Sequence, residues 1–374
     1  MRIAVVGGGP GGLYFAYLWK RRHPDAQIDL FEQNPSNATF GFGVVFSDQA
    51  LDFLRADDPE TVDAIAPHME RWKNITINLR GETIAIDGVG FSAIGRLQLL
   101  NLLQQRLAAV GVRAQFERAI QFPAELAGYD LIVAADGLNS TLRRAYEGDF
   151  GTSLSYSSNK FSWFGTTKVF DTLSQTFVAT GQGAFNAHHY RYSKTMSTFL
   201  VECDRATWLG YGFASKTPDE SKTICEQVFA DVLDGHPLVS NKSAWRSFPW
   251  VWNEHWSFQN IVLIGDALHT AHFSIGSGTR LAMEDSIALV KALETAGGIP
   301  EALAQYQAER KPVVEKLVAA ARTSADWYER FAEHMQLPLL DFAYSYITRS
   351  GRVDRARLHA MSPAFMAGYE ASRA

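Results

Sequence analysis

Cysteine is scarce in this chain: only Cys203 and Cys225 occur among 374 residues. Two cysteines supply neither a disulfide framework nor the paired spacing of a zinc site, so we expect no bound metal. No stretch approaches about 18 consecutive apolar residues, and we therefore expect no membrane-spanning helix. The apolar run before the first glycines is too short for the core of a signal peptide. A reducing cytoplasm is the expected compartment.

An excess of charge of either sign is also missing. The formal net charge is −5 at pH 7, with 20% charged and 47% hydrophobic residues. This balance gives no electrostatic reason to expect nucleic acid or an anionic membrane as a partner. It is ordinary for a globular protein. The length suffices for one large domain or for two interleaved ones.

The chain opens with the pattern of a βαβ unit. A short apolar run predicts a strand over 2–6, which is followed by a helix over 10–22 and a second strand over 27–32. Leucines at helical spacing predict a further helix over 96–110. Strand, helix and strand in this order are typical of a parallel sheet that binds nucleotides.

The pattern changes in the middle of the chain. Between 155 and 203, successive β-rich runs predict an antiparallel sheet, and long amphipathic stretches from residue 278 onward predict helices. The expected fold class is α/β, with a discontinuous Rossmann-type domain, an inserted antiparallel β-sheet substrate domain and a helical C-terminus. The expected segments are strands 130–135 and 261–264, helices 279–296, 299–322 and 324–335, a nucleotide-binding domain over 1–154 and 255–322, a β-sheet domain over 155–254 and a helical segment over 323–374.

The first motif is the glycine loop "VVGGGPGG". Gly7, Gly9 and Gly12 form G-x-G-x-x-G between the first strand and its helix, with Pro10 and Gly11 inside the loop. Glycine permits the tight turn, the close approach of a pyrophosphate and the packing of helix on strand. Unpaired N–H groups at the helix start favour a phosphate. Glu32 ends the next strand, where an acid accepts hydrogen bonds from ribose hydroxyls, so the loop predicts dinucleotide binding.

Two further motifs follow predicted strands. Asp136 and Gly137 open "DGLNSTLRR", in which Ser140 and Arg143 follow at fixed spacing. Gly265 and Asp266 open "GDALHTAHFSIGSG", which leads through a second glycine loop into a helix.

The three motifs together resemble those of the FAD-dependent single-component aromatic monooxygenases related to para-hydroxybenzoate hydroxylase. They occur in the family's order as G-x-G-x-x-G at 7–12, D-G-x-x-S-x-x-R at 136–143 and G-D-A-x-H at 265–269. The resemblance implies that FAD is the cofactor and that NADH or NADPH binds transiently as co-substrate. It also implies that O2 hydroxylates an aromatic ring through a flavin C4a-hydroperoxide.

The resemblance assigns roles to residues outside the first glycine loop. Asp266 holds the ribityl and pyrophosphate region, and Asp136 lies between FAD and the nicotinamide donor. Gly276 and Gly278 bring backbone N–H groups at a helix start to the flavin, where the helix dipole stabilises negative charge. The implied cofactor contacts beyond the first loop and Glu32 are Gly43, Arg96, Asp136, Asp266, Gly276 and Gly278.

Two stretches resemble a narrower branch, that of salicylyl-CoA 5-hydroxylase and the flavin domain of 2-aminobenzoyl-CoA monooxygenase/reductase. They are "AHFSIGSGTRLAMEDSIAL" and "FAYSYITRSGRVDRARL". Many relatives instead have a proline near Phe273-Ser274 and an asparagine at Arg280. The middle stretches "NKFSWFGTTKVFD" and "YSKTMSTFLVEC" also resemble the hydroxylase of violacein biosynthesis. The implied substrate is an aryl-CoA thioester such as salicylyl-CoA, with a free aromatic acid or an indolic intermediate as the alternative.

Candidate substrate residues lie in "FNAHHYRYS" and beside the second glycine loop. Period two places His188, Tyr190 and Tyr192 on one face of a strand, and we expect that face to look toward the flavin. His188 or Tyr190 could then hydrogen-bond or deprotonate a phenol, although such residues in a sheet are more often structural. His272 is the third catalytic candidate.

Basic residues near the C-terminus are the candidates for a CoA contact. Arg349 and Arg352 begin a cluster of arginines, and guanidinium groups recognise the phosphates of CoA well. A solvated helix face is the alternative explanation of such a cluster. We expect the other partners to be O2 and a small aromatic molecule, and the chain to act as a monomer or homodimer.

Three other functions share parts of this pattern. A flavin-dependent halogenase would show W-x-W-x-I-P, whereas Trp250 and Trp252 are here followed by Asn-Glu-His. A reductase of the same fold would oxidise NAD(P)H without consuming oxygen, because fold alone does not set the reaction. A flavin-binding module without activity would show no ligand-stimulated reduction.

Overall fold

The computed structural model describes residues 1–47 and 52–373. Its first sheet has six strands in the order β17-β18-β9-β1-β2-β8. The five strands from β18 to β8 pair in parallel, and β17 is antiparallel at one edge. Strands β9 and β18 are apolar and buried throughout, and β1 is so after Arg2, as expected for strands covered on both faces, whereas β2 has the half-buried Asp29 at its centre. The strands are β1 (Arg2–Val6), β2 (Gln27–Phe31), β8 (Ala114–Gln115), β9 (Leu131–Ala134), β17 (Ser257–Phe258) and β18 (Ile261–Leu263).

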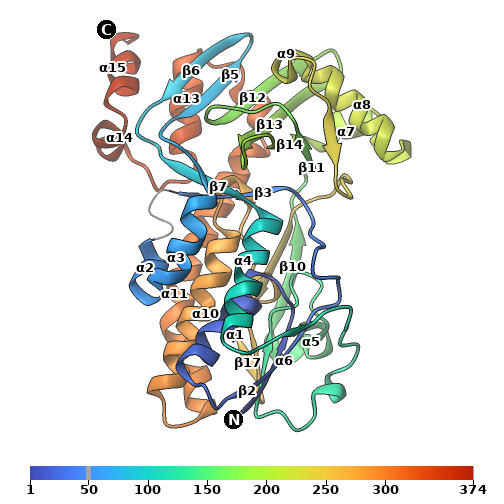
Figure 1. Cartoon of the computed structure of the whole chain (residues 1–374). Coiled ribbons are helices and arrows are strands. Elements are labelled where there is room, and N and C mark those ends of the chain that lie inside the picture. The colour runs from blue at the N-terminus through green and yellow to red at the C-terminus, as the bar shows by residue number, and fades with distance from the viewer. Residues whose placement is uncertain (48–51, 374) are drawn as a thin grey trace.

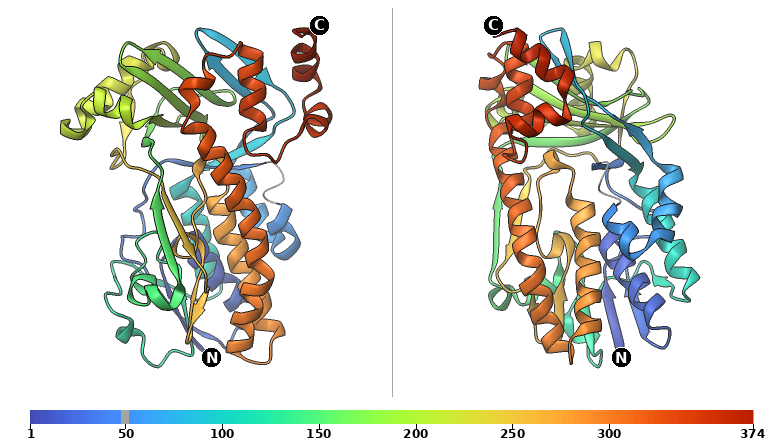
Figure 2. Two further views of the ribbon diagram at one scale, coloured as in Figure 1. Left: turned by 180° about the vertical axis from the view of Figure 1, so that it is seen from behind. Right: turned by 90° about the vertical axis from the view of Figure 1, so that its left-hand side faces the viewer.

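Long helices pack against this sheet. Helix α1 contacts both α4 and α10, and α10 runs beside α11 (Figures 1 and 2). Their apolar faces join the strands in one buried core. This core therefore holds the first glycine loop and the start of α10 in fixed positions. The helices are α1 (Pro10–Arg22), α4 (Arg96–Ala109), α10 (Gly278–Thr295) and α11 (Ile299–Tyr328).

The second large sheet has seven strands in the order β15-β11-β14-β13-β12-β5-β6. All neighbours are antiparallel except β12 and β5. It lies at the end of the molecule far from the N-terminus (Figure 1). The strands are β5 (Ile75–Leu79), β6 (Glu82–Ile86), β11 (Lys160–Thr166), β12 (Leu173–Thr180), β13 (Gly183–Arg191), β14 (Ser197–Cys203) and β15 (Leu238–Ser240).

Helices cover the two faces of this sheet. A core around Phe185 and Phe199 packs one face against α7, α8 and α9. A core around Phe177 and Phe342 packs the other face against the C-terminal helices. The helices are α7 (Arg205–Gly210), α8 (Pro218–Val228), α9 (Ala230–Leu233), α12 (Phe331–His334), α13 (Leu339–Thr348), α14 (Arg355–Met361) and α15 (Pro363–Ala371).

Smaller elements connect the two large sheets. Strand β7 pairs with β3 and β4, and β10 pairs with β16. The strands β3 and β7 lead directly into the region between the sheets (Figure 1). These elements are β3 (Gly43–Ser47), α2 (Asp52–Asp57), α3 (Pro59–Ile65), β4 (Glu70–Trp72), β7 (Phe91–Gly95), α5 (Thr141–Ala145), α6 (Glu147–Phe150), β10 (Thr152–Tyr156) and β16 (Pro249–Asn253).

The expected α/β class is confirmed. The predicted helix break near residue 323 is wrong, because α11 continues to Tyr328. The two polar residues at the predicted break fit into the continuous helix: Thr323 donates to Ala319 O at 3.1 Å, and Ser324 Oγ lies 2.8 Å from Ser274 Oγ, which is outside the helix. Strands β5 and β6 lie inside the first predicted domain range but pair in the seven-stranded sheet. The domain boundaries stay a prediction.

Candidate functional site

The first glycine loop joins β1 to α1. Gly7 has φ 109°, and a Cβ there would overlap Ala135 O. A Cβ on Gly12 would overlap Gly7 O, so only glycine lets the helix approach the strand this closely. A Cβ on Gly9 would meet nothing within 4 Å. The N-terminus of α1 therefore faces open space beside Gly9, where a phosphate has room.

Glu32 fastens this loop to the end of β2. One carboxylate oxygen accepts from Gly8 N at 2.7 Å, and the other accepts from Asn34 N at 2.8 Å. The second oxygen also accepts from Asn34 Nδ2 at 2.7 Å, and the side chain is half-buried. The carboxylate is thus held in place at the loop that the sequence assigns to a dinucleotide.

Asp136 and Arg143 form a joint between two motifs. Asp136 Oδ2 accepts from Thr141 N at 2.7 Å, whereas its buried Oδ1 has no partner in the described part of the chain. Burial raises the pKa of Asp136. The Arg143 guanidinium donates to Leu138 O at 2.5 Å and Ala267 O at 3.1 Å. The second motif therefore fixes the position of the third.

Asp266 is open to solvent although protein atoms crowd around it, and we call these surroundings the recess. Its side chain is exposed, yet the surrounding protein raises its pKa by desolvation, against the attraction of Arg96. Burial likewise lowers the pKa of Arg96, whose Nε is buried with no partner among the described residues. An exposed carboxylate and an unpaired guanidinium nitrogen deep in the fold are groups that a polar ligand would satisfy.

Asp285 of α10 organises the G-D-A-x-H motif and was missed from the sequence. Its carboxylate accepts from Gly265 N, His269 Nε2 and Arg310 Nε, each at 3.0 Å. Burial alone would raise the pKa of Asp285, but His269 and Arg310 outweigh it and lower that pKa. His269 is therefore a support of the loop. An acid on the apolar face of the predicted helix 279–296 was the available signal.

The chain from Gly41 to Val45 passes between the seven-stranded sheet and the second glycine loop. Tyr190 donates from its hydroxyl to Gly43 O at 2.9 Å, and Thr198 Oγ1 accepts from Gly43 N at 2.9 Å. Gly276 has φ 61°, and a Cβ there would lie 2.9 Å from Val45 Cγ1. The Tyr190 hydroxyl thus holds the backbone of this segment, and its catalytic role stays a prediction.

Gly278 begins α10 directly after this loop. A Cβ at Gly278 would meet nothing within 4 Å, and the helix start has no side-chain cap. Its free N–H groups therefore face space that an anionic or electron-rich ring could fill.

Aromatic side chains line the region between the two sheets. Phe161 and Trp163 of β11 are half-buried, as are Phe248 and Phe273. The Phe273 ring lies 4.9 Å from Phe161 and 5.3 Å from His188, centroid to centroid. The rings form an apolar wall beside the second glycine loop, and such walls exclude water from a reacting centre.

A buried polar cluster lies behind this wall. His188 Nδ1 lies 3.0 Å from Gln175 Nε2, and His188 Nε2 lies 3.4 Å from Glu202 Oε2. Glu202 is 2% exposed and also accepts from Asn159 Nδ2 at 2.9 Å. Burial raises the pKa of Glu202 and, with Arg349, lowers that of His188 to about 3. Both His188 nitrogens are therefore occupied by protein groups.

Glu202 was missed from the sequence, although an acid inside the apolar run "TFLVEC" was a signal for it. The neighbouring His189 points to the opposite face of the sheet and stacks on Phe199 at 5.2 Å. The expected alternation of His188 and His189 between faces is thus present. Tyr192, on the same face as His188, lies against Gly43.

His272 is 2% exposed and lies among aromatic rings. Phe248 and Phe273 are 4.8 Å and 4.0 Å away, centroid to centroid. Its Nδ1 accepts from Ser274 N at 3.3 Å and lies 2.9 Å from Ser274 Oγ. Burial lowers the pKa of His272 to about 4 against the attraction of Glu202, so the ring is neutral at pH 7.

The two arginines that were predicted to contact CoA lie in different environments. Arg349 donates to Ser274 O at 2.8 Å, Ser324 Oγ at 3.0 Å and Tyr346 O at 2.6 Å. Arg352 is exposed, and partial desolvation by nearby protein atoms, together with the charges of Arg280 and Arg357, lowers its pKa. Arg357 also donates to Arg352 O at 3.2 Å. The contact of Arg349 with CoA stays a prediction that this geometry does not favour.

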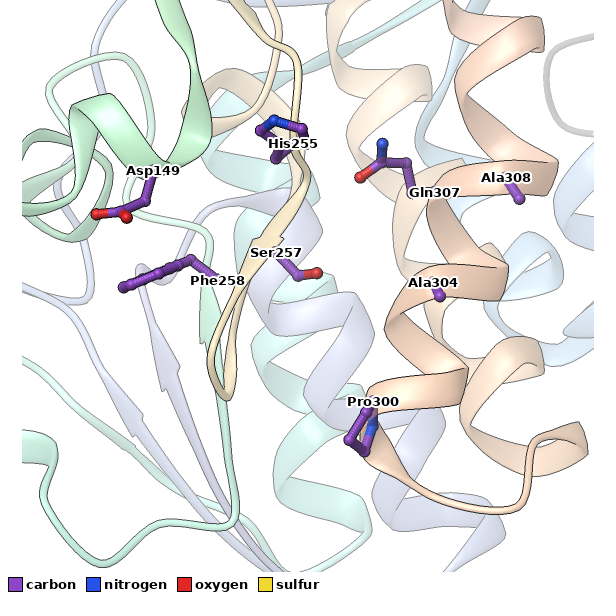
Figure 3. Close-up of a pocket in the computed structure, with 8 residues that line it drawn as sticks. All are labelled: Asp149, His255, Ser257, Phe258, Pro300, Ala304, Gln307 and Ala308. Carbon is purple, nitrogen blue, oxygen red and sulfur yellow. The ribbon is translucent and has the colours of Figure 1, made fainter.

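A separate pocket lies beside the first turns of α11, between that helix and β17 (Figure 3). None of the predicted site residues lines it. Its lining residues are Asp149, His255, Ser257, Phe258, Pro300, Ala304, Gln307 and Ala308.

In the described part of the chain, no group of three or more His, Cys, Asp or Glu side chains is arranged to hold a metal ion. Over the same residues, no helix has the length and apolar character needed to cross a membrane.

Family models match most of the chain. Residues 124–321 match the FAD binding domain, and residues 5–41 match the NAD(P)-binding Rossmann-like domain. The first range includes the second and third motifs, and the other includes the first glycine loop and Glu32. FAD is thus the cofactor, and NAD(P)H is the co-substrate.

Curated relatives align over almost the whole chain. A salicyloyl-CoA 5-hydroxylase of a Streptomyces species is 42% identical over 377 residues, covering 98% of this chain and 72% of the relative. A 3-hydroxy-4-methyl-anthranilyl-[aryl-carrier protein] 5-monooxygenase of Streptosporangium sibiricum is 36% identical over 94% of this chain and 95% of the relative. Protodeoxyviolaceinate monooxygenase of Chromobacterium violaceum is 33% identical over 93% and 94%.

Solved structures agree on the fold. The crystal structure of 2-methyl-3-hydroxypyridine-5-carboxylic acid oxygenase has a TM-score of 0.74 at 16% identity, and covers 96% of both chains. Together with the glycine loops and the recess around Asp266, these similarities identify the family. The chain belongs to the FAD-dependent aromatic monooxygenases.

Proposed function

We propose that this monooxygenase hydroxylates the ring of an aryl thioester, in particular an aryl-CoA such as salicylyl-CoA. The observation that carries the proposal is the arginine cluster Arg280, Arg352 and Arg357 beside the start of α10. Arg280 pairs with Glu284 at 2.7 Å, whereas Arg352 and Arg357 form no ion pair with a described carboxylate. Neighbouring arginines of which two lack an acidic partner favour a phosphate-bearing ligand.

Two relatives support the same substrate class. One is a salicyloyl-CoA hydroxylase, and the other acts on an anthranilyl group carried by an aryl-carrier protein. CoA and carrier proteins both present the acyl group on a phosphopantetheine arm, which places a phosphate at a distance from the ring. The arginines at the helix start would bind this charged end while the ring enters the aromatic wall.

The residues that would hold FAD follow from the recess. The α1 start beside Gly9 would receive the pyrophosphate, Glu32 the ribose and Asp266 the ribityl chain. Asp136 Oδ1 and Arg96 Nε are buried atoms that lack a partner among the described residues, as expected for groups that a cofactor satisfies. The proposed contacts are Gly7, Gly9, Pro10, Gly11, Gly12, Glu32, Gly43, Arg96, Asp136, Asp266, Gly276 and Gly278.

Bound FAD, once reduced by NAD(P)H, would supply the activated oxygen that is transferred to the ring. The chain's own share is position and shielding. Gly43, held by Tyr190 and Thr198, would keep one side of the ring system in place, together with Val45 beside Gly276. Phe161, Trp163 and Phe273 would exclude water from the reacting atoms. We further propose that the protein works in the cytoplasm as a monomer or homodimer.

The test is steady-state oxidation of NADH and NADPH by the FAD-loaded protein, with oxygen uptake and product mass followed in parallel. The ligands are salicylate, salicylyl-CoA, 2-aminobenzoyl-CoA and tryptophan. We expect an aryl-CoA to stimulate turnover and to give a product that is heavier than the substrate by one oxygen atom. Stimulation by the free acid or the indole alone would contradict the thioester proposal and leave the monooxygenase class intact.

Arg352→Gln tests the arginine cluster separately. Loss of one exposed guanidinium should raise KM for the aryl-CoA by about fivefold and leave kcat unchanged. Arg355→Gln is the matched control, because Arg355 is also exposed on the same segment but pairs with Glu370. Equal KM values for both variants would remove Arg352 from the proposed phosphate site.

A further inference from the structure

A chain of polar side chains connects the C-terminal segment to His272. Arg349 Nε donates to Ser324 Oγ at 3.0 Å, Ser324 Oγ lies 2.8 Å from Ser274 Oγ, and Ser274 Oγ lies 2.9 Å from His272 Nδ1. The four residues come from the segment after α13, from α11 and from the loop before α10. Segments about 75 residues apart in sequence therefore meet at one histidine.

The direction of this chain is forced by chemistry. An arginine can only donate, so Ser324 Oγ accepts from Arg349, and it donates to Ser274 Oγ because the single hydroxyl hydrogen of Ser274 is used on His272 Nδ1. Ser274 in turn donates to His272 Nδ1. The backbone N–H of Ser274, which also can only donate, points to the same Nδ1 at 3.3 Å. His272 Nδ1 is therefore an acceptor, and the proton of the neutral ring lies on Nε2.

The Nε2–H group of His272 is the last group in this series of hydrogen bonds. No described residue accepts a hydrogen bond from it, although the side chain is only 2% exposed. This nitrogen is not among the buried polar atoms that lack a partner, so it keeps contact with solvent and an oxygen atom of a ligand could reach it. The neighbouring rings of Phe248 and Phe273 belong to the aromatic wall that is proposed to enclose the substrate.

We propose that Arg349, Ser324 and Ser274 fix His272 as an Nε2–H donor to an oxygen atom of the aromatic substrate. This inference rests on the proposed function. His272 is the residue that contacts the substrate, and Arg349 and the two serines are positioning residues. No covalent step is required of them: the donor orients the ring through a carbonyl or hydroxyl oxygen.

Charged groups around His272 favour the same neutral state. Glu202 of β14 attracts a proton to the ring, whereas Arg349 and His188 of β13 oppose it. The Tyr328 ring of α11 lies 6.3 Å from the imidazole and is uncharged, because burial raises the pKa of its hydroxyl well above the usual value. Removal of the Arg349 charge should therefore raise the pKa of His272, so that the ring begins to protonate at a higher pH.

The first part of the test reads the imidazole directly. Histidine labelled with 15N in the FAD-loaded full chain should show His272 as the neutral Nε2–H tautomer across pH 5 to 8. Arg349→Gln should raise the His272 pKa from about 4, and Arg349→Lys, which keeps the charge, should raise it less. The Nδ1–H tautomer in the wild type, or an unchanged pKa in Arg349→Gln, would overturn the inference.

The second part reads the reaction. His272→Gln retains an N–H donor and His272→Phe does not, so KM for the aryl-CoA should rise about tenfold more in His272→Phe. In Arg349→Gln, the acid limb of the pH profile of product formed per NAD(P)H should move to higher pH. Arg355→Gln is the control, and its profile should match the wild type.

Failure of this inference is distinguishable from failure of the proposed function. A wild type that hydroxylates no aryl thioester would contradict the proposed function. A wild type that does so, with equal KM values for His272→Gln and His272→Phe, would overturn the role of His272 alone.

Discussion

The recess that is proposed to hold FAD and the region that is proposed to hold the substrate are formed by different kinds of groups. The recess is made of glycines and backbone groups that follow short strands, together with Glu32, Asp136 and Asp266. The substrate region is made of side chains from β11, β13, β14, α11 and the segment after α13. In the first region the backbone must approach a ligand closely. In the second, packed rings hold a few polar groups, so its geometry depends on contacts that are distant in sequence.

The largest contrast is expected between two glycines of the first loop. In Gly7→Ala, the new Cβ would overlap Ala135 O at a positive φ, so the free energy of unfolding should fall by about 3 kcal/mol. In Gly9→Ala, the Cβ meets nothing within 4 Å, so the fold should persist while FAD affinity falls. Urea unfolding and flavin titration of both variants measure this contrast. A stable Gly7→Ala protein that binds FAD normally would contradict it.

Asp285→Asn should act on the recess through the G-D-A-x-H motif. Arg310 would keep only its pair with Glu284 at 2.7 Å and lose the buried charge of Asp285, so the free energy of unfolding should fall by about 3 kcal/mol at pH 7. The folded pKa of Asp285 is lowered, so its contribution is present above the unfolded pKa and is lost as pH falls through the folded pKa. Unfolding at pH 7 and at pH 3 should thus show a smaller difference between variant and wild type at pH 3. A constant difference would contradict the ion-pair account.

Tyr190→Phe sharpens the boundary between the two regions. The variant loses the hydrogen bond to Gly43 O and should be less stable by about 1 kcal/mol. If Tyr190 only holds this backbone, kcat at saturating substrate should stay within a fewfold of the wild type. Thermal unfolding and steady-state kinetics separate the two roles, and a loss of product with an unchanged flavin environment would instead indicate a catalytic hydroxyl.

Glu202→Gln is expected to have the smallest effect on stability, and its sign depends on pH. The folded pKa of Glu202 is raised by burial, so the stabilisation from its protonation is present below the unfolded pKa and is lost as pH rises through the folded pKa. Glutamine does not ionise, so the variant does not lose stability as the pH rises. Relative to the wild type, the variant should therefore gain stability between pH 4.5 and pH 8 in urea unfolding. A variant that becomes relatively less stable over this range would show that the carboxylate is stabilised by its neighbours.

The recess could be predicted from the sequence because its motifs are local. Gly7, Gly9 and Gly12 follow a strand and precede a helix within a few residues, and Asp136 and Asp266 each end a strand. The role of Asp285 was not predicted because its partners Gly265, His269 and Arg310 lie up to 25 residues away in sequence, and only folding brings them together.

The substrate region was only partly predictable. The alternation in β13 placed His188 and Tyr190 on one face, but their partners Glu202 and Gly43 come from other strands. The arginines near the C-terminus show the same limit: Arg349 donates to Ser274 and Ser324, whereas Arg352 is exposed near Arg280. Nothing in the local spacing of these arginines distinguishes the two roles, because the difference is set by how α13 packs against the sheet and α11.

The most direct test of the central claim is the source of the oxygen in the product. The FAD-loaded protein would be supplied with NADH, salicylyl-CoA and 18O2, and the product analysed by mass spectrometry. A hydroxylated thioester that carries one 18O atom is the predicted result. Oxidation of NADH with the thioester recovered unchanged and no 18O incorporated would contradict the claim that this site hydroxylates an aryl thioester.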